Sequence, residues 1–240
     1  MTLALSARIA DLEAMLARIA RTHDPSTLAS SLSAEDMVIT DVILRRGLKI
    51  DIFTLDTGRL HADTLEVIEA IHRRYGCRVT VYKPDAAAVA GYVAEFGRNG
   101  FYASADLRKR CCQIRKVEPL RRALQGRKSW ITGQRRAQAV TREALPLEEH
   151  DAAHGLAKFN PLADWSEDQI WDYLRLNRVP YNRLYDEGYR SIGCAPCTRP
   201  TVAGEDVRAG RWWWESPESR ECGLHLAPDG RLVRATEALA

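Results

Sequence analysis

Four cysteines in two widely separated clusters constrain the fold of this chain more than any other feature. Cys111 and Cys112 are adjacent within a basic run, and Cys194 and Cys197 form a C-x-x-C pair much later in the chain. Four thiolates gathered in space are typical of a metal site, and the set suits either zinc or an iron–sulfur cluster. Adjacent cysteines leave the backbone in different directions and cannot form a zinc knuckle, so the pattern favours iron–sulfur. The fold must then bring both clusters together.

The stretches around these clusters alternate between strand-like and helix-like patterns. An amphipathic helix is expected over residues 1–21, because its apolar residues recur at helical spacing. Strands are expected at 26–32, 49–55, 78–82 and 129–133, and helices at 33–47, 64–75, 86–96, 166–176 and from the first cysteine pair through 117–124. This order predicts a doubly wound parallel α/β sheet, with ligands bound at the carboxyl ends of its strands.

The domain organisation follows from a change in composition near residue 200. Loop-like residues there precede Trp212, Trp213 and Trp214. We expect residues 1–200 to form one α/β domain and residues 201–240 to form a mobile C-terminal tail. The alternative is that the tryptophans form a last layer of the core, and it stays open because large aromatic side chains favour burial.

Composition excludes some classes of protein and favours others. No apolar run approaches the ~20 residues of a membrane span, and the N-terminus has no signal-peptide layout, so we expect a cytoplasmic protein whose thiols serve metals or catalysis. Only six of the 35 basic residues are Lys, and the arginines are dense at 108–116 and 133–142, which favours an oxyanion site. Aromatic residues are not interleaved with them, so nucleic-acid binding is not expected. Whether the chain forms a homo-oligomer stays open.

Two polar turns follow neighbouring strands and predict a shared binding site. Ser31 and Ser33 lie just before a helix, where hydroxyl and backbone N–H groups favour an anion, although ordinary capping by Ser33 explains this turn equally well. The next strand ends in a second polar turn, Asp56-Thr57-Gly58-Arg59. Because both turns belong to the same sheet edge, a nucleotide-sized site there is the stronger interpretation.

Cys222 is a candidate nucleophile because it lies in a polar, glycine-containing part of the tail. Its thiol would need cationic neighbours to lower its pKa, and the arginine clusters could supply them. From position alone, a spare surface cysteine is an equal alternative. His225 could help to activate the thiol or only cap the tail, and Cys77 is expected to be a small buried hydrophobe.

Taken together, several stretches resemble the assimilatory sulfonucleotide reductases, in particular the iron–sulfur adenylyl-sulfate (APS) reductases. The resemblance runs from about residue 25 to 228, and the matching stretches are residues 33–36, 55–60, 109–116, 131–136, 191–197, 211–215 and 221–225. The paired cysteines, the C-x-x-C pair and the tail motif carry most of the specificity. One departure lies in the first turn, where the family often has Ser-Phe-Gly-Ala-Glu-Asp and this chain has Ser-Leu-Ser-Ala-Glu-Asp at residues 31–36.

The resemblance implies a fold of the adenine-nucleotide α-hydrolase type and a specific chemistry. It implies a [4Fe–4S] cluster on Cys111, Cys112, Cys194 and Cys197. It also implies that Cys222 attacks the sulfur of APS, which releases AMP and leaves an S-sulfocysteine that thioredoxin or a glutaredoxin-like thiol converts to sulfite. The substrate's charge would then be held by Lys116, Arg135, Arg136, Arg142 and Arg190.

Two alternatives to APS reduction remain. A reductase of 3′-phosphorylated APS (PAPS) needs only an added phosphate pocket, which this many arginines could form. A zinc-stabilised nucleotide-binding regulator without turnover belongs to another class, and a colourless protein with one zinc would support it.

Overall fold

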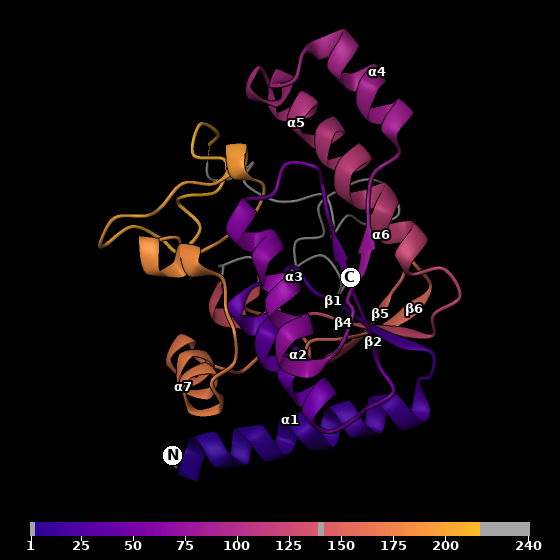
Figure 1. Cartoon of the computed structure of the whole chain (residues 1–240), viewed down its shortest axis with the longest axis vertical. Helices are drawn as coiled ribbons and strands as arrows, with labels where there is room; N and C mark the ends of the chain where they lie inside the picture. The colour runs from indigo at the N-terminus through magenta and orange to yellow at the C-terminus, as the bar shows by residue number, and fades with distance from the viewer. Residues whose placement is uncertain (1–2, 139–141, 217–240) are drawn as a thin grey trace.

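The computed structural model describes residues 3–138 and 142–216, and its centre is one six-stranded sheet (Figure 1). The strands are β1 (Ser26–Ala29), β2 (Asp51–Leu55), β3 (Thr80–Tyr82), β4 (Ser129–Ile131), β5 (Glu148–Asp151) and β6 (Leu156–Phe159). The α-helices are α1 (Leu3–Thr22), α2 (Ala34–Arg45), α3 (Ala62–Tyr75), α4 (Ala86–Phe96), α5 (Ala105–Cys112), α6 (Glu118–Ala123) and α7 (Glu167–Asn177). Cys222 and His225 lie outside the described residues.

The sheet has the order β3-β2-β1-β4-β6-β5, and every neighbouring pair is parallel except β5 with β6. The chain therefore adds β2 and β3 on one side of β1 and then crosses back to add β4, β6 and β5 on the other side. This order confirms the predicted doubly wound sheet and puts a topological switch point between β1 and β4. The antiparallel edge strand β5 was not predicted, and neither was β6. The sequence of β5 is entirely polar, which gives no strand pattern.

Helices cover both faces of the sheet because the strands are apolar on both sides. Along β2, Ile52 belongs to a core with α1, α2, α3 and α7, whereas its neighbour Phe53 packs with α6. In β4, Ile131 and Trp130 divide between the same two cores. Adjacent strand residues point to opposite faces, so this division follows from the continuous apolar runs.

The helix that carries the first cysteine pair continues into a π-helical turn. α5 ends at Cys112, η2 (Gln113–Val117) is the π turn, and α6 follows directly. The predicted continuation of the helix is confirmed, but its π character was not predicted. A π turn shifts the helical register of the residues that follow. The Arg115 and Lys116 side chains therefore project from a different face of the helix than they would in a regular α-helix.

The described part of the expected tail packs on the domain. The Trp212 side chain is fully buried, and Thr198 and Arg211 form an antiparallel bridge. The backbone N–H of Trp212 donates to the carbonyl oxygen of Cys197 at 3.1 Å. Residues 210–212 are therefore buried against the domain, whereas residues 202–204 and Trp213 are exposed, and the domain boundary at residue 200 stays a prediction. Among the described helices, none is long and apolar enough to cross a membrane.

Candidate functional site

A cavity of about 270 Å³ lies at the carboxyl ends of β1, β2 and β4. Its volume is close to the lower end of the range for small-molecule sites, about 300–1,000 Å³. The site residues expected from the sequence that line it are Ser31, Ser33, Thr57, Lys116, Arg135, Arg142 and Arg190. The carboxyl edge of the sheet is where a doubly wound fold binds its ligand, and the first polar turn meets Thr57 of the second turn in one cavity there.

The turn after β1 is organised around the buried carboxylate of Asp36. Its Oδ2 accepts hydrogen bonds from the N–H and hydroxyl of Ser31, at 2.6 and 2.7 Å, and from the hydroxyl of Ser33 at 3.2 Å. Ser33 is the N-cap residue of α2, but its hydroxyl makes no capping hydrogen bond. Burial raises the pKa of Asp36 to about 6, against the lowering effect of the bonds from Ser31. Leu32 has a φ of 63°, so this turn holds a strained left-handed residue.

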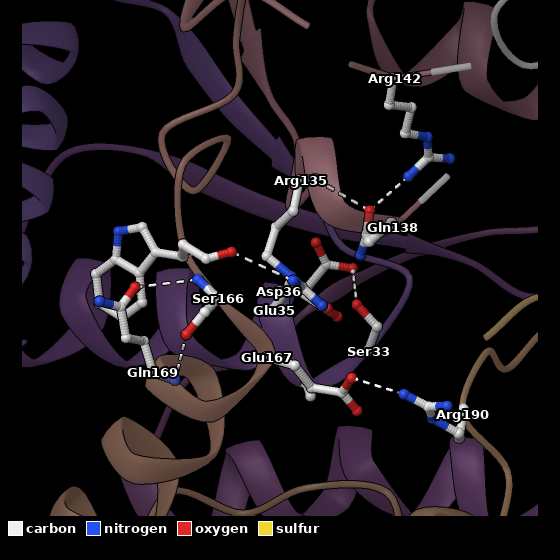
Figure 2. A network of polar contacts seen from close by, with 12 residues as sticks. Ser33, Glu35, Asp36, Arg135, Gln138, Arg142, Ser166, Glu167, Gln169 and Arg190 are labelled. Carbon is white, nitrogen blue, oxygen red and sulfur yellow. Dashed lines mark hydrogen bonds and ion pairs between the residues drawn. The ribbon is translucent and has the colours of Figure 1, made fainter. Parts of the chain in front are cut away.

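Arg135 is tied to the protein rather than exposed in the cavity. Its Nε donates to Glu35 Oε1 at 2.9 Å, and its Nη1 donates to the carbonyl oxygen of Trp165 at 3.2 Å (Figure 2). Gly133, two residues earlier, packs so closely on α2 that an added Cβ would lie 2.4 Å from Asp36 Oδ1. Arg135 therefore joins the turn after β4 to the first turn of α2.

The other predicted arginines occupy three different settings. Arg142 donates to Gln138 Oε1, the oxygen that also accepts the backbone N–H of Arg135 (Figure 2). Arg190 forms an ion pair of 2.9 Å with Glu167 in the first turn of α7, and both side chains line the cavity. Arg136 pairs with Asp164 and is not part of the cavity lining.

The turn after β2 connects the nucleotide-sized cavity to the second cysteine pair. Thr57 lines the cavity, and its hydroxyl lies 3.2 Å from Cys194 Sγ. Asp56 instead closes its own turn by accepting the Gly58 N–H at 2.9 Å, and neither residue lines the cavity. The carbonyl oxygen of Arg59 accepts the N–H of Ala195 at 2.7 Å, and the Arg59 side chain lines the cysteine cavity described next.

All four cysteines line a second, smaller cavity. Cys111 and Cys112 come from α5, and Cys194 and Cys197 come from the loop that bridges to Leu60. Lys116 and Cys194 line both cavities, so the two sites share a wall. The structure thus brings together the two clusters that are far apart in the sequence.

The lining of the cysteine cavity supplies four sulfur donors, the ligand set of an iron–sulfur cluster. Within the described residues, no three His, Cys, Asp or Glu side chains converge closely enough to hold a single metal. A zinc ion would need its sulfur ligands about 2.3 Å from one point. The indole Nε1 of Trp212 is buried against this cavity without a hydrogen-bond partner in the described part of the chain, and a sulfur-rich acceptor would satisfy it. Burial and the neighbouring Cys194 raise the pKa of the Cys197 thiol to about 12, so a cationic group is needed to hold it as thiolate.

Comparison with known proteins agrees with this geometry. The sequence model of the phosphoadenosine phosphosulfate reductase domain matches residues 25–200. The chain is 57% identical to the adenosine 5′-phosphosulfate reductase of Allochromatium vinosum, over 88% of this chain and 82% of that protein. It is 55% identical to the enzyme of that name from Burkholderia cepacia, over 92% of this chain and 89% of that protein. The chain belongs to the sulfonucleotide reductase family.

Solved structures support the fold of this sulfonucleotide reductase. The phosphoadenylyl-sulfate reductase of Candida auris, solved with phosphate, superposes with a TM-score of 0.68 at 28% identity, over 78% of this chain and 90% of that one. An FMN adenylyltransferase of Candida glabrata shares the fold alone, with a TM-score of 0.59 at 16% identity, over 91% and 75% of the two chains. The expected adenine-nucleotide type of fold is confirmed.

Several residues of this sulfonucleotide reductase were missed by the sequence reasoning. Arg115 is buried in the π turn and donates from Nη1 to the carbonyl oxygen of Thr57 at 2.7 Å. Arg208 and Arg211 line the nucleotide-sized cavity from the C-terminal segment. Arg115 had a signal in the basic run, and Arg211 had one in the matching stretch 211–215, but nothing in the sequence indicated that Arg208 and Arg211 reach the cavity.

Proposed function

We propose that the chain reduces adenosine 5′-phosphosulfate to sulfite and AMP, with Cys222 as the nucleophile. One observation carries the proposal: a nucleotide-sized cavity shares Lys116 and Cys194 with a cavity lined by four cysteines. The relatives named adenosine 5′-phosphosulfate reductase, at 45–57% identity, favour this substrate over its 3′-phosphorylated form. Reducing conditions suit the described cysteines, none of which forms a disulfide, and we place the reaction in the cytoplasm.

The four cysteines would hold a [4Fe–4S] cluster, which would hold α5 and the C-x-x-C loop rigidly beside the substrate cavity. Lys116 lies in the π turn directly after the first cysteine pair and lines both cavities. Its ammonium group would therefore carry charge from the cysteine side toward the phosphosulfate. Thr57 would also connect the substrate cavity to the cysteines, since it lines that cavity and its hydroxyl contacts Cys194.

The residues at the carboxyl edge of the sheet would bind the nucleotide and its charge. Arg142, Arg190, Arg208 and Arg211 line the cavity from several directions, as two phosphorus- and sulfur-centred anions require. Each fixed donor aimed at charge that develops in the transition state contributes about 3 kcal/mol. We propose that Arg135 acts by holding Glu35 and the first turn of α2 in place, because its guanidinium is buried in that ion pair.

The reaction proceeds by two sulfur-transfer steps. The Cys222 thiolate attacks the sulfur of the sulfonyl group, an S–S bond forms, and the S–O bond to phosphate breaks so that AMP leaves with the electron pair. A dithiol such as thioredoxin or a glutaredoxin-like protein then attacks the cysteine sulfur of the adduct. Sulfite leaves with two electrons, and the resulting mixed disulfide resolves to give the oxidised partner and free Cys222.

Substrate preference is tested by steady-state rates of sulfite release with both nucleotides. We expect the purified chain, with thioredoxin as reductant, to have a much higher kcat/KM for adenosine 5′-phosphosulfate than for its 3′-phosphorylated form. Iron and sulfide analysis should give four of each per chain, with broad visible absorption. A preference for the 3′-phosphorylated substrate would contradict the proposed substrate, and one zinc without iron or turnover would support the regulator instead.

The nucleophile is tested by Cys222→Ser, with Cys77→Ser as the matched control. Cys222→Ser should retain iron and AMP binding but release no sulfite, because the hydroxyl cannot form the S-sulfonate. Cys77 packs beside the apolar core away from both cavities, so its substitution should leave the rate nearly unchanged. Mass spectrometry of the wild-type chain after one turnover without reductant should show sulfonate on Cys222, and a variant that still releases sulfite would refute its role.

A further inference from the structure

A buried ion pair connects the first cysteine pair to the C-terminal segment. Arg108, on α5, binds Glu215 with two parallel contacts, Nε to Oε1 at 2.6 Å and Nη2 to Oε2 at 3.0 Å. The two side chains are only 1% and 6% exposed. Two-pronged arginine–carboxylate pairs have one preferred geometry, and breaking a buried one leaves a charge without compensation. The contact therefore fixes the position of Glu215 closely.

Trp212 extends this contact to the second cysteine pair. The guanidinium carbons of Arg108 and Arg211 each lie 4.5 Å from the centre of its ring system. The backbone N–H of Trp212 donates to Cys197. We call the set of Arg108, Arg211, Trp212 and Glu215 the Arg108 clasp. It ties α5, the C-x-x-C loop and the C-terminal segment to one another.

The ion pair of the clasp stands outside the nucleotide site. The described residues that line the 270 Å³ cavity include neither Arg108 nor Glu215. The pair therefore does not touch the expected substrate position, and a buried arginine here gives no contact to an incoming anion. Arg108 does line the cysteine cavity, three positions before Cys111. The pair also has a distinctive place in the chain, because Cys222 follows Glu215 by seven positions (222 − 215 = 7).

We propose that the Arg108–Glu215 pair is a positioning device that fixes the point at which the segment carrying Cys222 begins. This inference rests on the proposed role of Cys222. Seven residues span at most about 25 Å when fully extended, so the location of their origin decides which part of the domain the thiol can reach. A fixed origin also raises the effective concentration of the thiol at the cavity and restricts its direction of approach.

The length of the chain between the clasp and Cys222 and the orientation of that segment make different contributions to the rate at which Cys222 reacts. If the pair is broken and the chain is held only from Trp212, the tether grows from seven to ten residues (222 − 212 = 10). Effective concentration falls roughly as the −3/2 power of length, which gives a loss of less than about twofold. A larger loss requires that the clasp also sets the orientation of the segment, and small misplacements of a reacting group can lower rates by far more than this.

Glu215→Gln tests the proposal because it keeps the shape of the side chain and removes its charge. The measurement is the single-turnover rate at which sulfonate appears on Cys222, followed by mass spectrometry without reductant. We expect this rate to fall more than about threefold, above the limit set by tether length alone. Iron content, visible absorption and the KM for the nucleotide should match the wild-type chain, so that the loss appears in kcat.

Glu205→Gln is the matched control in the same segment. Glu205 forms an equally two-pronged pair with Arg199, at 2.9 Å for both contacts, but this pair is not attached to α5. Its substitution should leave the S-sulfonation rate within about twofold of wild type, as expected for a partly exposed pair. Arg108→Lys is measured in parallel, because it keeps a cation on α5 but loses the two-pronged geometry, and it should show the same selective loss.

The possible outcomes distinguish an error in the clasp proposal from an error in the proposed role of Cys222. If the wild-type chain forms sulfonate on Cys222 and both clasp variants do so within threefold of its rate, the clasp proposal is overturned while the proposed function stands. Loss of iron in both variants in proportion to the rate also overturns it, since the pair would then only support the cysteine cavity. If the wild-type chain forms no sulfonate at all, the nucleophile itself is wrong and the clasp loses its role with it.

Discussion

Among single residues, Asp36 makes a contribution to stability that depends on pH. Burial raises its pKa from 3.8 to about 6, so the folded chain holds this proton more tightly than the unfolded chain does. The stabilisation is therefore complete below pH 3.8 and is lost as the pH rises through 6. At neutral pH the folded state carries a buried carboxylate that is compensated by the hydrogen bonds from Ser31 and Ser33.

Asp36→Asn should remove this pH dependence. The amide keeps an acceptor for the serine donors and carries no charge. We expect the unfolding free energy of the variant, relative to wild type, to rise between pH 5 and pH 7 by about 1 kcal/mol and then to level off, because one pKa unit corresponds to about 1.4 kcal/mol. Urea unfolding at pH 5, 6, 7 and 8 measures it. A difference that stays constant over this range would show that Asp36 is ionised throughout.

Burial of charged residues is what the sequence could not reveal. Arg135 was predicted to hold substrate charge, yet its partner is Glu35, one hundred positions earlier in the chain. Arg108 and Arg115 lie in a basic run that predicts an anion-binding surface, but both are buried and paired within the protein. Local patterns report that arginines are clustered, whereas only the fold decides which of them face the cavity.

At the scale of elements, the site depends on a close approach of the turn after β4 to the N-terminus of α2. Gly133 makes this approach possible, since an added Cβ would lie 2.4 Å from Asp36 Oδ1 and 2.9 Å from Glu35 Cβ. Gly133→Ala should therefore destabilise the fold by about 1–3 kcal/mol through overpacking. It should also weaken AMP binding, because the turn that carries Ser31 and Ser33 must move.

Gly91→Ala is the matched control for this substitution. Gly91 lies inside α4, and an added Cβ there would meet nothing within 4 Å. Alanine is the better helix former by about 1 kcal/mol, so this variant should be slightly stabilised and should bind AMP normally. Urea unfolding and isothermal titration with AMP compare the two. Equal behaviour of both variants would show that the contact between the β4 turn and α2 is not tight.

The elements themselves were largely predictable where apolar periodicity was strong. The buried runs of β1, β2 and β4 and the stripes of α1, α3 and α7 predicted the sheet, its class and its binding edge. β5 and β6 were missed because their pairing comes from each other and from β4, while β5 has no apolar residue. The π turn after Cys112 was missed because helical spacing does not distinguish it from an ordinary helix.

At the scale of the whole molecule, we expect the sheet to stay folded when the region around the cysteine cavity is destabilised. Neither apolar core, within the described part of the chain, includes any of the four cavity cysteines. Removal of the proposed cluster with a chelator and an oxidant should therefore leave the sheet folded. Hydrogen exchange should become faster in α5, in η2 and in residues 192–212, and should stay slow in β1, β2 and β4.

Nucleotide binding provides the second readout of this experiment. The iron-free chain should bind AMP more weakly, because the wall between the two cavities loses its support on the cysteine side. Circular dichroism should show nearly unchanged helix content as the control for global unfolding. Uniformly faster exchange across the sheet would contradict the separation and would make the cluster a requirement for the whole fold.

Lys116 and Cys194 belong to the walls of both cavities, and this shared partition has a consequence for maturation. With the proposed cluster, a newly made chain has an unfinished wall on its nucleotide side until the inorganic group arrives. Loading with iron would then have to precede substrate capture. In a cell short of iron, folded but idle chains would accumulate, and the supply of metal rather than of polypeptide would limit how fast sulfur enters metabolism.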